Sequence, residues 1–311
     1  MYSYIEIYGI RLRIFTENIS LSEMIGKYYE AFLVEHLDTY DIDISLERFW
    51  YFSKKVDFQR DEGFVSFGDG VKIHTDSQQY FFRDQEVSGM LDFSRDTIKV
   101  QGKLIPHRLR HLIHITLQWI RRIDKFYNRF LIKTCIHDIV FIVLEKKLKS
   151  CLLHATAVTN GEKTFLFTGL GGSGKSTMAS AFSQLKGYTI LSDNYAIVSE
   201  NSVYPFPELP RITKGTQKLL WINLNKKADG IKNYLENDVT KLVEKYTIDA
   251  IFICSYGKDF HLTRLEDTDY IFELLFSINN YTKEFPEYLN LALLSVIKEF
   301  NTNGERLESL N

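Results

Sequence analysis

The residues with the clearest chemical meaning lie just past the midpoint of the chain, in the pattern G-x-x-x-x-G-K-S from Gly169 to Ser176. An apolar run precedes this pattern and a helical pattern follows it. Glycines let the backbone turn through positive φ and bring successive N–H groups, together with the start of the next helix, close to an anion. The pattern therefore predicts a Walker A phosphate-binding loop. The residues expected to contact phosphate are Gly169, Gly171, Gly172, Ser173, Gly174, Lys175, Ser176 and Thr177.

Individual residues of this loop carry specific expectations. Gly171, Gly172 and Gly174 are expected to have positive φ values. Lys175 should neutralise charge on the β- and γ-phosphates, and Ser176 should hold Mg²⁺ through its hydroxyl, so ATP and Mg²⁺ are the expected cofactors. The loop alone does not distinguish an ATPase, a GTPase, a transport motor or a kinase, and GTP stays an alternative nucleotide.

Polar residues beside two further apolar runs are candidates for the rest of the site. Asp193 follows Lys175 by 18 residues and ends an apolar run, where a carboxylate can reach Mg²⁺ or an attacking nucleophile. Asn194 follows directly, and His154 lies on the strand that runs toward the loop. Two alternatives stay open: Asp193 as the metal ligand of an ATPase that is not a kinase, and His154 as a packed core histidine.

The order of three segments, His154–Val158, Gly169–Thr177 and Leu191–Asn194, resembles the HPr kinase/phosphorylase family, whose relatives share the phosphoenolpyruvate carboxykinase-like P-loop fold. Supporting segments are Tyr204–Pro207 and Ile248–Cys254, and the resemblance covers about residues 130–300. Among these segments only the Walker loop is highly specific by itself.

The resemblance implies roles for three residues. Asp193 would act as the base on the acceptor hydroxyl, His154 would support it, and Asn194 would lie near the metal. Lys175 completes the catalytic set, and the expected metal ligands are Ser176, Asp193 and Asn194. The family has two adjacent acids where this chain has Asp193 and Asn194. Asn coordinates Mg²⁺ in protein kinases, so forward phosphoryl transfer is still expected with Asn194 in place of the second acid. The replacement is expected to affect mainly phosphorolysis, which is the family's reverse reaction, and the strength of metal binding.

Three parts are expected along the chain: a smaller α+β domain at residues 1–102, a helical bridge at 103–150, and an α/β P-loop domain of the HPr kinase C-terminal type at 151–311. The first part reads as short β segments separated by turn signals, with a hairpin at Gly68–Gly70 and helical spacing over Leu21–Leu37.

The third part supplies the elements that position the loop. Cys151–Val158 reads as a strand, Asn160-Gly161 as a type I′ turn, and Lys163–Thr168 as the returning strand. Further elements are expected as a helix at Thr177–Leu185 and strands at Tyr188–Leu191 and Ile248–Ser255. Alternating strands and helices predict a layered sheet with the nucleotide at its carboxyl edge.

Two helices are expected in the bridge, one from Pro106 to Ile123 and one from Ile132 to Leu148. Residues 103–133 include eight Lys or Arg and one acid, Asp124, for which a solvated helix face is favoured over a docking surface. One helical face also carries three histidines, His107, His111 and His114. Structural histidines are favoured over a metal site because no carboxylate lies among them.

Composition sets limits on partners and location. A net charge of −2 gives no general attraction to nucleic acid or to an anionic membrane. Three cysteines without a C-x-x-C pair argue against a disulfide framework and fit a reducing cytoplasm. No signal peptide is indicated, and the longest apolar run, Ile139–Leu144, is far shorter than a membrane span.

These observations favour a cytoplasmic Mg-ATP-dependent kinase that transfers the γ-phosphoryl group to a hydroxyl, most simply a serine of a peptide or small protein. Relatives with an unrelated N-terminal domain include modifiers of ribosomally made peptides, so the resemblance makes a precursor peptide a reasonable acceptor. Alternatives are a kinase of free serine or another small molecule, a non-catalytic ATP-binding regulator, and nucleic-acid binding through the basic helices. The oligomeric state stays open, with a homo-oligomer as one alternative.

Overall fold

The computed structural model describes residues 1–48, 65–67, 71–76, 79–84, 87–104, 122–206, 211–220, 232–234, 244–259, 261–267, 270–271 and 273–275. The chain divides into two compact units, and the division falls inside helix α4 (Asp138–Leu148), between Leu144 and Glu145. Residues 103–150, expected as a bridge, are therefore divided between the two units.

The first unit is built on a nine-stranded sheet with the order β3-β1-β2-β4-β9-β8-β7-β6-β5. The pairs β2–β4 and β4–β9 are parallel, and the other neighbours are antiparallel. Its strands are β1 (Tyr2–Ile7), β2 (Ile10–Thr16), β3 (Leu33–Val34), β4 (Ile42–Arg48), β5 (Val65–Phe67), β6 (Val71–Asp76), β7 (Gln79–Asp84), β8 (Val87–Asp92) and β9 (Ile98–Leu104). Its helical elements are α1 (Ile19–Tyr28), the 3₁₀ turn η1 (Glu30–Phe32), α3 (Arg122–Ile132), the π-helix η2 (Lys133–His137) and the first part of α4.

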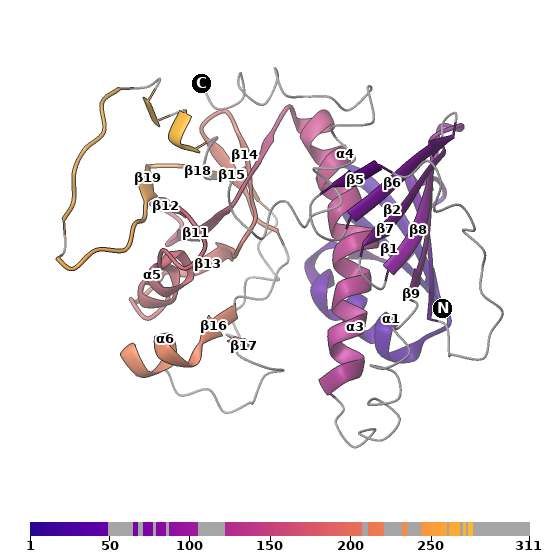
Figure 1. Ribbon diagram of the computed structural model, residues 1–311, viewed down its shortest axis with the longest axis horizontal. Helices are drawn as coiled ribbons and strands as arrows, with labels where there is room; N and C mark the ends of the chain where they lie inside the picture. The colour runs from indigo at the N-terminus through magenta and orange to yellow at the C-terminus, as the bar shows by residue number, and fades with distance from the viewer. Residues whose placement is uncertain are drawn as a thin grey trace. The chain divides into compact units, whose positions relative to one another are not determined.

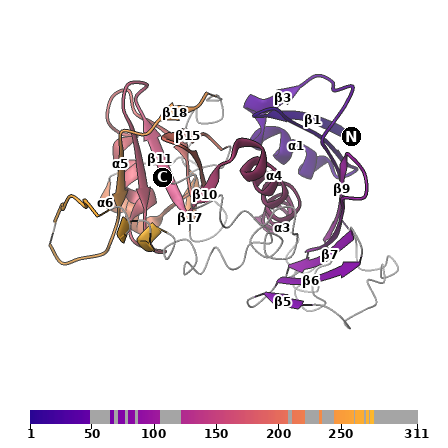
Figure 2. The same ribbon diagram turned by 90° about the horizontal axis from the view of Figure 1, so that it is seen from above.

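Apolar and charged residues alternate along strands such as β2, which explains why one face of this sheet is buried. In β2, Leu12 and Ile14 are buried while Arg11 and Arg13 face the other side. Arg13 lies opposite Asp43 of β4 and makes two hydrogen bonds to its carboxylate, at 3.0 and 2.8 Å, which holds the register of this parallel pair. Helices α1 and α3 lie along the sheet, as Figures 1 and 2 show.

The π-helix η2 packs closely against the sheet at Gly102 of β9. A Cβ atom at this position would lie 2.4 Å from Sγ of Cys135 in η2. The second expected helix, Ile132–Leu148, is confirmed over η2 and α4, with the π turn near its start. Helix α3 extends the helical run back to Arg122, so residues 124–131, which lie between the two expected helices, are also helical. Of the first expected helix, only residues from Arg122 onward are described, and the three histidines of its pattern lie outside the described residues.

Two other expectations for the first unit have clear outcomes. The hairpin is confirmed by the antiparallel pair β5–β6, which Phe67 and Val71 close, while Gly68–Gly70 themselves lie outside the described residues. The helix expected over Leu21–Leu37 is wrong in its second half. It ends at Tyr28, because Leu33 and Val34 pair with β1 as an edge strand.

The second unit contains two four-stranded sheets, ordered β10-β14-β15-β18 and β13-β11-β12-β19, and a two-stranded pair, β16-β17. Its strands are β10 (Cys151–Leu153), β11 (Ala155–Thr159), β12 (Thr164–Thr168), β13 (Thr189–Ser192), β14 (Ala196–Ser199), β15 (Ser202–Tyr204), β16 (Arg211–Thr213), β17 (Lys232–Tyr234), β18 (Tyr246–Thr247) and β19 (Ala250–Ile253). Its described helices include α5 (Lys175–Phe182) and α6 (Lys214–Leu219), besides the end of α4.

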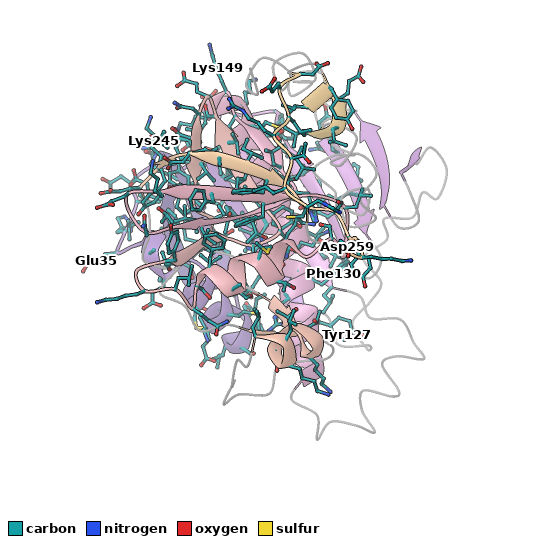
Figure 3. The ribbon with its side chains drawn as sticks, turned by 90° about the vertical axis from the view of Figure 1, so that its left-hand side faces the viewer. Glu35, Tyr127, Phe130, Lys149, Lys245 and Asp259 are labelled. Carbon is teal, nitrogen blue, oxygen red and sulfur yellow. The ribbon has the colours of Figure 1, made fainter. Side chains whose placement is uncertain are left out.

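The second unit is layered. Ala155 and Ala157 of β11 pack in a core between the two larger sheets, whereas Val158 packs with Ala179 of α5 on the other face. Figure 1 shows α5 lying beside β11 and β13. Charged residues such as Lys149, Lys245 and Asp259 are exposed on the outside of this unit (Figure 3).

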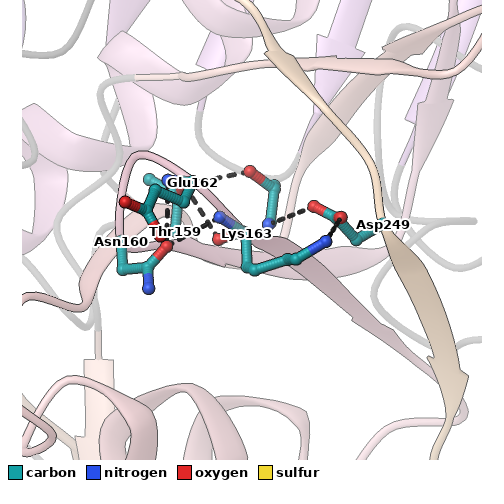
Figure 4. Close-up of polar contacts among 6 residues, drawn as sticks. Thr159, Asn160, Glu162, Lys163 and Asp249 are labelled. Carbon is teal, nitrogen blue, oxygen red and sulfur yellow. Dashed lines mark hydrogen bonds and ion pairs between the residues drawn. The ribbon is translucent and has the colours of Figure 1, made fainter.

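The structure corrects two expectations here. The single strand expected over Cys151–Val158 is two strands in different sheets, with His154 at the change of direction between them. The type I′ turn is wrong because Asn160 does not have the positive φ that this turn requires. Its Oδ1 instead accepts hydrogen bonds from the N–H groups of Glu162 and Lys163, at 3.0 and 2.7 Å, which stabilises a longer loop (Figure 4).

The remaining elements of the second unit differ from expectation mainly in their ends. The helix after the loop runs from Lys175 to Phe182, and the next strand is displaced by one residue to Thr189–Ser192. The strand expected at Ile248–Ser255 is confirmed over Ala250–Ile253. Among the helices within the described residues, none combines the length and the apolar character needed to cross a membrane.

Candidate functional site

Strand direction brings the candidate residues to one edge of the sheet β13-β11-β12-β19. Strand β11 is antiparallel to both β12 and β13, and β12 is parallel to β19. The carboxyl ends of β12, β13 and β19 therefore meet at the same edge, where β11 begins. His154, Gly169, Asp193 and Cys254 each lie one residue beyond an end of these strands, so the chain approaches this edge four times.

The glycine-rich loop leaves β12 and enters α5 at this edge. Gly169, Gly172 and Gly174 have positive φ values of 143°, 81° and 100°, whereas Gly171 does not, contrary to expectation. A Cβ atom added at Gly171, Gly172 or Gly174 would meet nothing within 4 Å, so this side of the loop is open. The loop thus has the conformation and the free space to accept an anion at the start of α5.

Gly169 meets a different requirement. A Cβ atom there would lie 2.3 Å from the carbonyl oxygen of Cys254 and 2.7 Å from Oγ of Ser173. The backbone of β12 and of the segment after β19 approach closely, since the N–H of Cys254 also donates to the carbonyl of Thr168 at 2.7 Å. A glycine is therefore needed at the first position of the loop both for φ and for space.

Lys175 is folded against the loop. Its Nζ donates to the carbonyl oxygens of Gly169 at 2.8 Å and Leu170 at 3.1 Å, and the residue is buried. Its charge also acts on Cys254: burial raises the pKa of the Cys254 thiol, and the positive charge of Lys175 opposes that rise. The ammonium group therefore lies within the loop, where an incoming phosphate chain would meet it.

Asp193 has the most informative contacts of the site. Its Oδ1 accepts a hydrogen bond from the hydroxyl of Ser176 at 2.8 Å and another from the hydroxyl of Thr156 at 2.8 Å. Asp193 is only 1% exposed. The structure thus joins the two sequence-predicted residues Ser176 and Asp193 directly, across 17 residues of chain, and adds Thr156, which sequence reasoning missed.

Asn194 and His154 lie beside this pair. Asn194 is buried and has φ of 71°, a left-handed conformation that Asn tolerates better than most residues. His154 is also buried, at 1% exposure, and its carbonyl oxygen accepts a hydrogen bond from the hydroxyl of Thr168 at 3.1 Å. This bond ties the start of β11 to the end of β12, so His154 is placed at the edge by its main chain.

The end of β16 and the start of α6 also lie close to α5, the helix that follows the loop. Oγ1 of Thr177 lies 3.0 Å from Oγ1 of Thr216, which lies 3.1 Å from Oγ1 of Thr213, the N-cap of α6. Lys214, at the first position of α6, is exposed. Thr216 is a second residue of the site region that the sequence did not single out.

The side-chain oxygen atoms of this site match the ligand preference of Mg²⁺. A hydroxyl, a carboxylate and an amide, from Ser176, Asp193 and Asn194, are hard ligands of the type that Mg²⁺ prefers. Within the part of the chain that the structure describes, no group of three His, Cys, Asp or Glu is placed to hold a metal by itself. Mg²⁺ would therefore take further ligands from nucleotide phosphates and water, as it usually does.

Thr156 could have been found from sequence by its polarity. It stands between Ala155 and Ala157 in β11, and it is fully buried. A buried hydroxyl needs a partner, which is a signal that a polar group lies nearby but does not name that group.

No protein-family model matches this chain, and no curated protein matches it. The resemblance to HPr kinases therefore depends on the quoted motifs, and the function of the site is inferred from its geometry.

Proposed function

We propose that this chain is a Mg-ATP-dependent kinase of the HPr kinase-like type, with its P-loop domain in the second unit, and that it transfers the γ-phosphoryl group to a serine hydroxyl of a peptide or small protein. The observation that carries the proposal is the direct contact between Ser176 of the loop and the buried carboxylate of Asp193. A hydroxyl and a carboxylate in contact at the start of a Walker helix are the pair that holds Mg²⁺ in P-loop nucleotide-binding proteins.

The glycine-rich loop supports binding of ATP, which is the phosphoryl donor. The start of a helix favours an anion because the first N–H groups of a helix have no partner within it, and Lys175 adds a positive charge against the loop backbone. Ser176, Asp193 and Asn194 would hold Mg²⁺, which would supply positive charge against the negative charge that develops on the phosphates. The chain's own task is to orient the phosphates and to hold oxygen ligands at a fixed place beside them.

Proton transfer is assigned to Asp193. As the acceptor oxygen forms a bond to the γ-phosphorus, its proton passes to the Asp193 carboxylate, and the bond from γ-phosphorus to the bridging oxygen breaks to release ADP. By resemblance, His154 supports the carboxylate and Asn194 lies near the metal. Burial of Asp193 favours this role because a shielded carboxylate has no bulk water to compete for the acceptor hydroxyl.

A second candidate is a nucleotide-binding regulator without turnover. The observation that favours it is Asn194, which stands where HPr kinases carry a second acid. In that case the loop would bind Mg-ATP and no acceptor would gain phosphate. A kinase of free serine is a third candidate, distinguished by its acceptor. A cytoplasmic location is part of the kinase proposal, since ATP and precursor peptides are available there.

The test is phosphoryl transfer from γ-labelled ATP with Mg²⁺, offering serine-containing peptides encoded beside the gene and, separately, free serine. Wild-type chain should label a peptide, while Lys175→Ala and Asp193→Asn should reduce the rate by about 10²–10⁴-fold. Label in free serine alone would favour the small-molecule kinase. Tight Mg-ATP binding with no labelled acceptor, in a panel widened to whole-cell peptide extracts, would replace the kinase with the regulator.

A further inference from the structure

A register shift places Asp193 on the α5 face of the sheet. Along β11 and β13, Val158 pairs with Ile190, but Ala157 pairs with Ser192, so one extra residue of β13 is inserted between these pairs. In the shifted register, the next pair after Ala157 and Ser192 would be Thr156 and Asp193, so these two residues lie opposite each other. Without the shift, Thr156 would lie opposite Ser192.

This shift decides which face the carboxylate occupies. Side chains alternate along a strand, so a one-residue insertion turns every later side chain to the other face. Ile190 packs on the α5 face and Leu191 packs between the two sheets. The insertion therefore returns Asp193 to the α5 face, where it meets Ser176 of α5 at 2.8 Å. Thr156 shares that face because Ala155 and Ala157 occupy the other.

Thr156 and Ser176 belong to different structural elements. Both hydroxyls donate to Oδ1 of Asp193 at 2.8 Å, but Ser176 belongs to the phosphate loop and is itself an expected metal ligand. Thr156 lies within a buried strand bonded on both sides by neighbours, and it is fully buried. The strand therefore fixes the position of the Thr156 hydroxyl, and the β-branched side chain of threonine limits rotation about χ1.

From this geometry we propose that Thr156 is a positioning residue, which holds the Asp193 carboxylate in the orientation that Ser176 and Mg²⁺ share. The inference rests on the proposed nucleotide-dependent function of the same site. Residues that orient a metal ligand by hydrogen bonding commonly change metal affinity or activity by 10–100-fold when they are lost.

The test compares Thr156→Val, which keeps the shape and removes the hydroxyl, with Thr156→Ser, which keeps the hydroxyl. The matched control is Thr159→Val on the same strand, whose buried hydroxyl bonds at the opposite edge, to the Lys163 carbonyl at 3.1 Å. Calorimetry measures nucleotide affinity with and without Mg²⁺, and kinetics measures kcat and KM separately.

In Thr156→Val, the gain in nucleotide affinity that Mg²⁺ provides should fall about 10-fold and kcat about 10–100-fold, with Mg²⁺-free affinity unchanged. Thr156→Ser and Thr159→Val should resemble the wild type. Thr156→Ala, which also lacks the hydroxyl, should reproduce the loss and serves if the valine variant does not fold. If the wild-type chain binds Mg-ATP but Thr156→Val and Thr159→Val show the same Mg²⁺-dependent affinity and the same kcat, the positioning role of Thr156 is overturned. The proposed function then still stands. A wild-type chain that binds no nucleotide overturns the proposed function, and the inference with it.

Discussion

At the scale of single residues, the candidate site depends on backbone conformations that few side chains accept. Gly169, Gly172 and Gly174 have positive φ, and Asn194 adopts a left-handed conformation directly after Asp193. Such conformations cost about 1–2 kcal/mol for most L-residues and persist where the surrounding structure holds them. The glycines of the loop and Asn194 are thus residue types that tolerate the φ values of their positions.

Two glycines of the loop should respond differently to alanine. Gly169→Ala should destabilise the fold by about 2–3 kcal/mol, since its φ is 143° and its Cβ would lie 2.3 Å from a backbone oxygen. Gly171→Ala should change stability by less than about 0.5 kcal/mol, because its φ is not positive and its Cβ meets nothing. Urea unfolding of both variants checks this. Equal stability of the two would show that the loop does not have the described conformation.

At the scale of elements, the parallel pair β12–β19 is held at the edge opposite the loop. Asp249 accepts a hydrogen bond from Nζ of Lys163 at 2.6 Å and another from the N–H of Thr164 at 2.8 Å (Figure 4). The N–H of Asp249 donates to the carbonyl of Thr164 at 2.9 Å. These bonds set the register in which Phe165 pairs with Ala250, and the same register brings Cys254 against Gly169.

This contact makes stability depend on pH with a defined sign. The hydrogen bond from Lys163 lowers the pKa of Asp249, and the same bond raises the pKa of Lys163. The contribution of Asp249 is complete above the pKa of an unfolded Asp and is lost as pH falls through its lowered value. The contribution of Lys163 is complete below the pKa of an unfolded Lys and is lost as pH rises through its raised value.

Asp249→Asn should therefore lower the unfolding temperature most between about pH 5 and pH 10, with the difference from wild type narrowing on either side. Thermal unfolding over a pH series measures this difference. Asp259→Asn, which removes an exposed carboxylate of the same unit, is the control and should follow the wild type throughout. A difference for Asp249→Asn that is constant with pH would mean that the lost interaction is not ionic.

At the scale of the whole molecule, the chain consists of two compact units with separate sheets, and every described residue of the candidate site belongs to the second. The first unit contributes a nine-stranded sheet whose outward face carries Arg13, with its guanidinium 4.0 Å from the centre of the Tyr40 ring. Nucleotide binding is therefore expected to act first on the second unit.

Hydrogen exchange should report this division. Mg-ATP should slow amide exchange in the loop from Gly169 to Ser176 and around Asp193, because phosphate contacts the loop N–H groups and binding stabilises the bound state. Peptides covering β1 and β2 should exchange at an unchanged rate. Lys175→Ala should show no protection at the same nucleotide concentration. Protection confined to the first unit would contradict the location of the site.

The sequence by itself determined the features that depend on near neighbours. The spacing of Gly169, Gly174, Lys175 and Ser176 predicted a turn into a helix, and the structure has that turn. The first hundred residues were expected to form short β segments, and β1 and β2 lie there. An apolar run ended by Asp193 predicted strand β13 to within one residue. These predictions succeeded because backbone conformation and side-chain period are set within a few residues.

Only the tertiary structure decided which distant residues meet. The division of residues 151–158 between two sheets, the inserted residue of β13 and the contact of Thr156 with Asp193 all depend on pairing between residues 30 to 47 positions apart. Local pattern carries no information about register between strands, since a shift of one residue leaves each sequence unchanged and exchanges the faces. The burial of Asp193 likewise follows from what packs around it, because a single carboxylate can lie in solvent or in a core with the same neighbours in sequence.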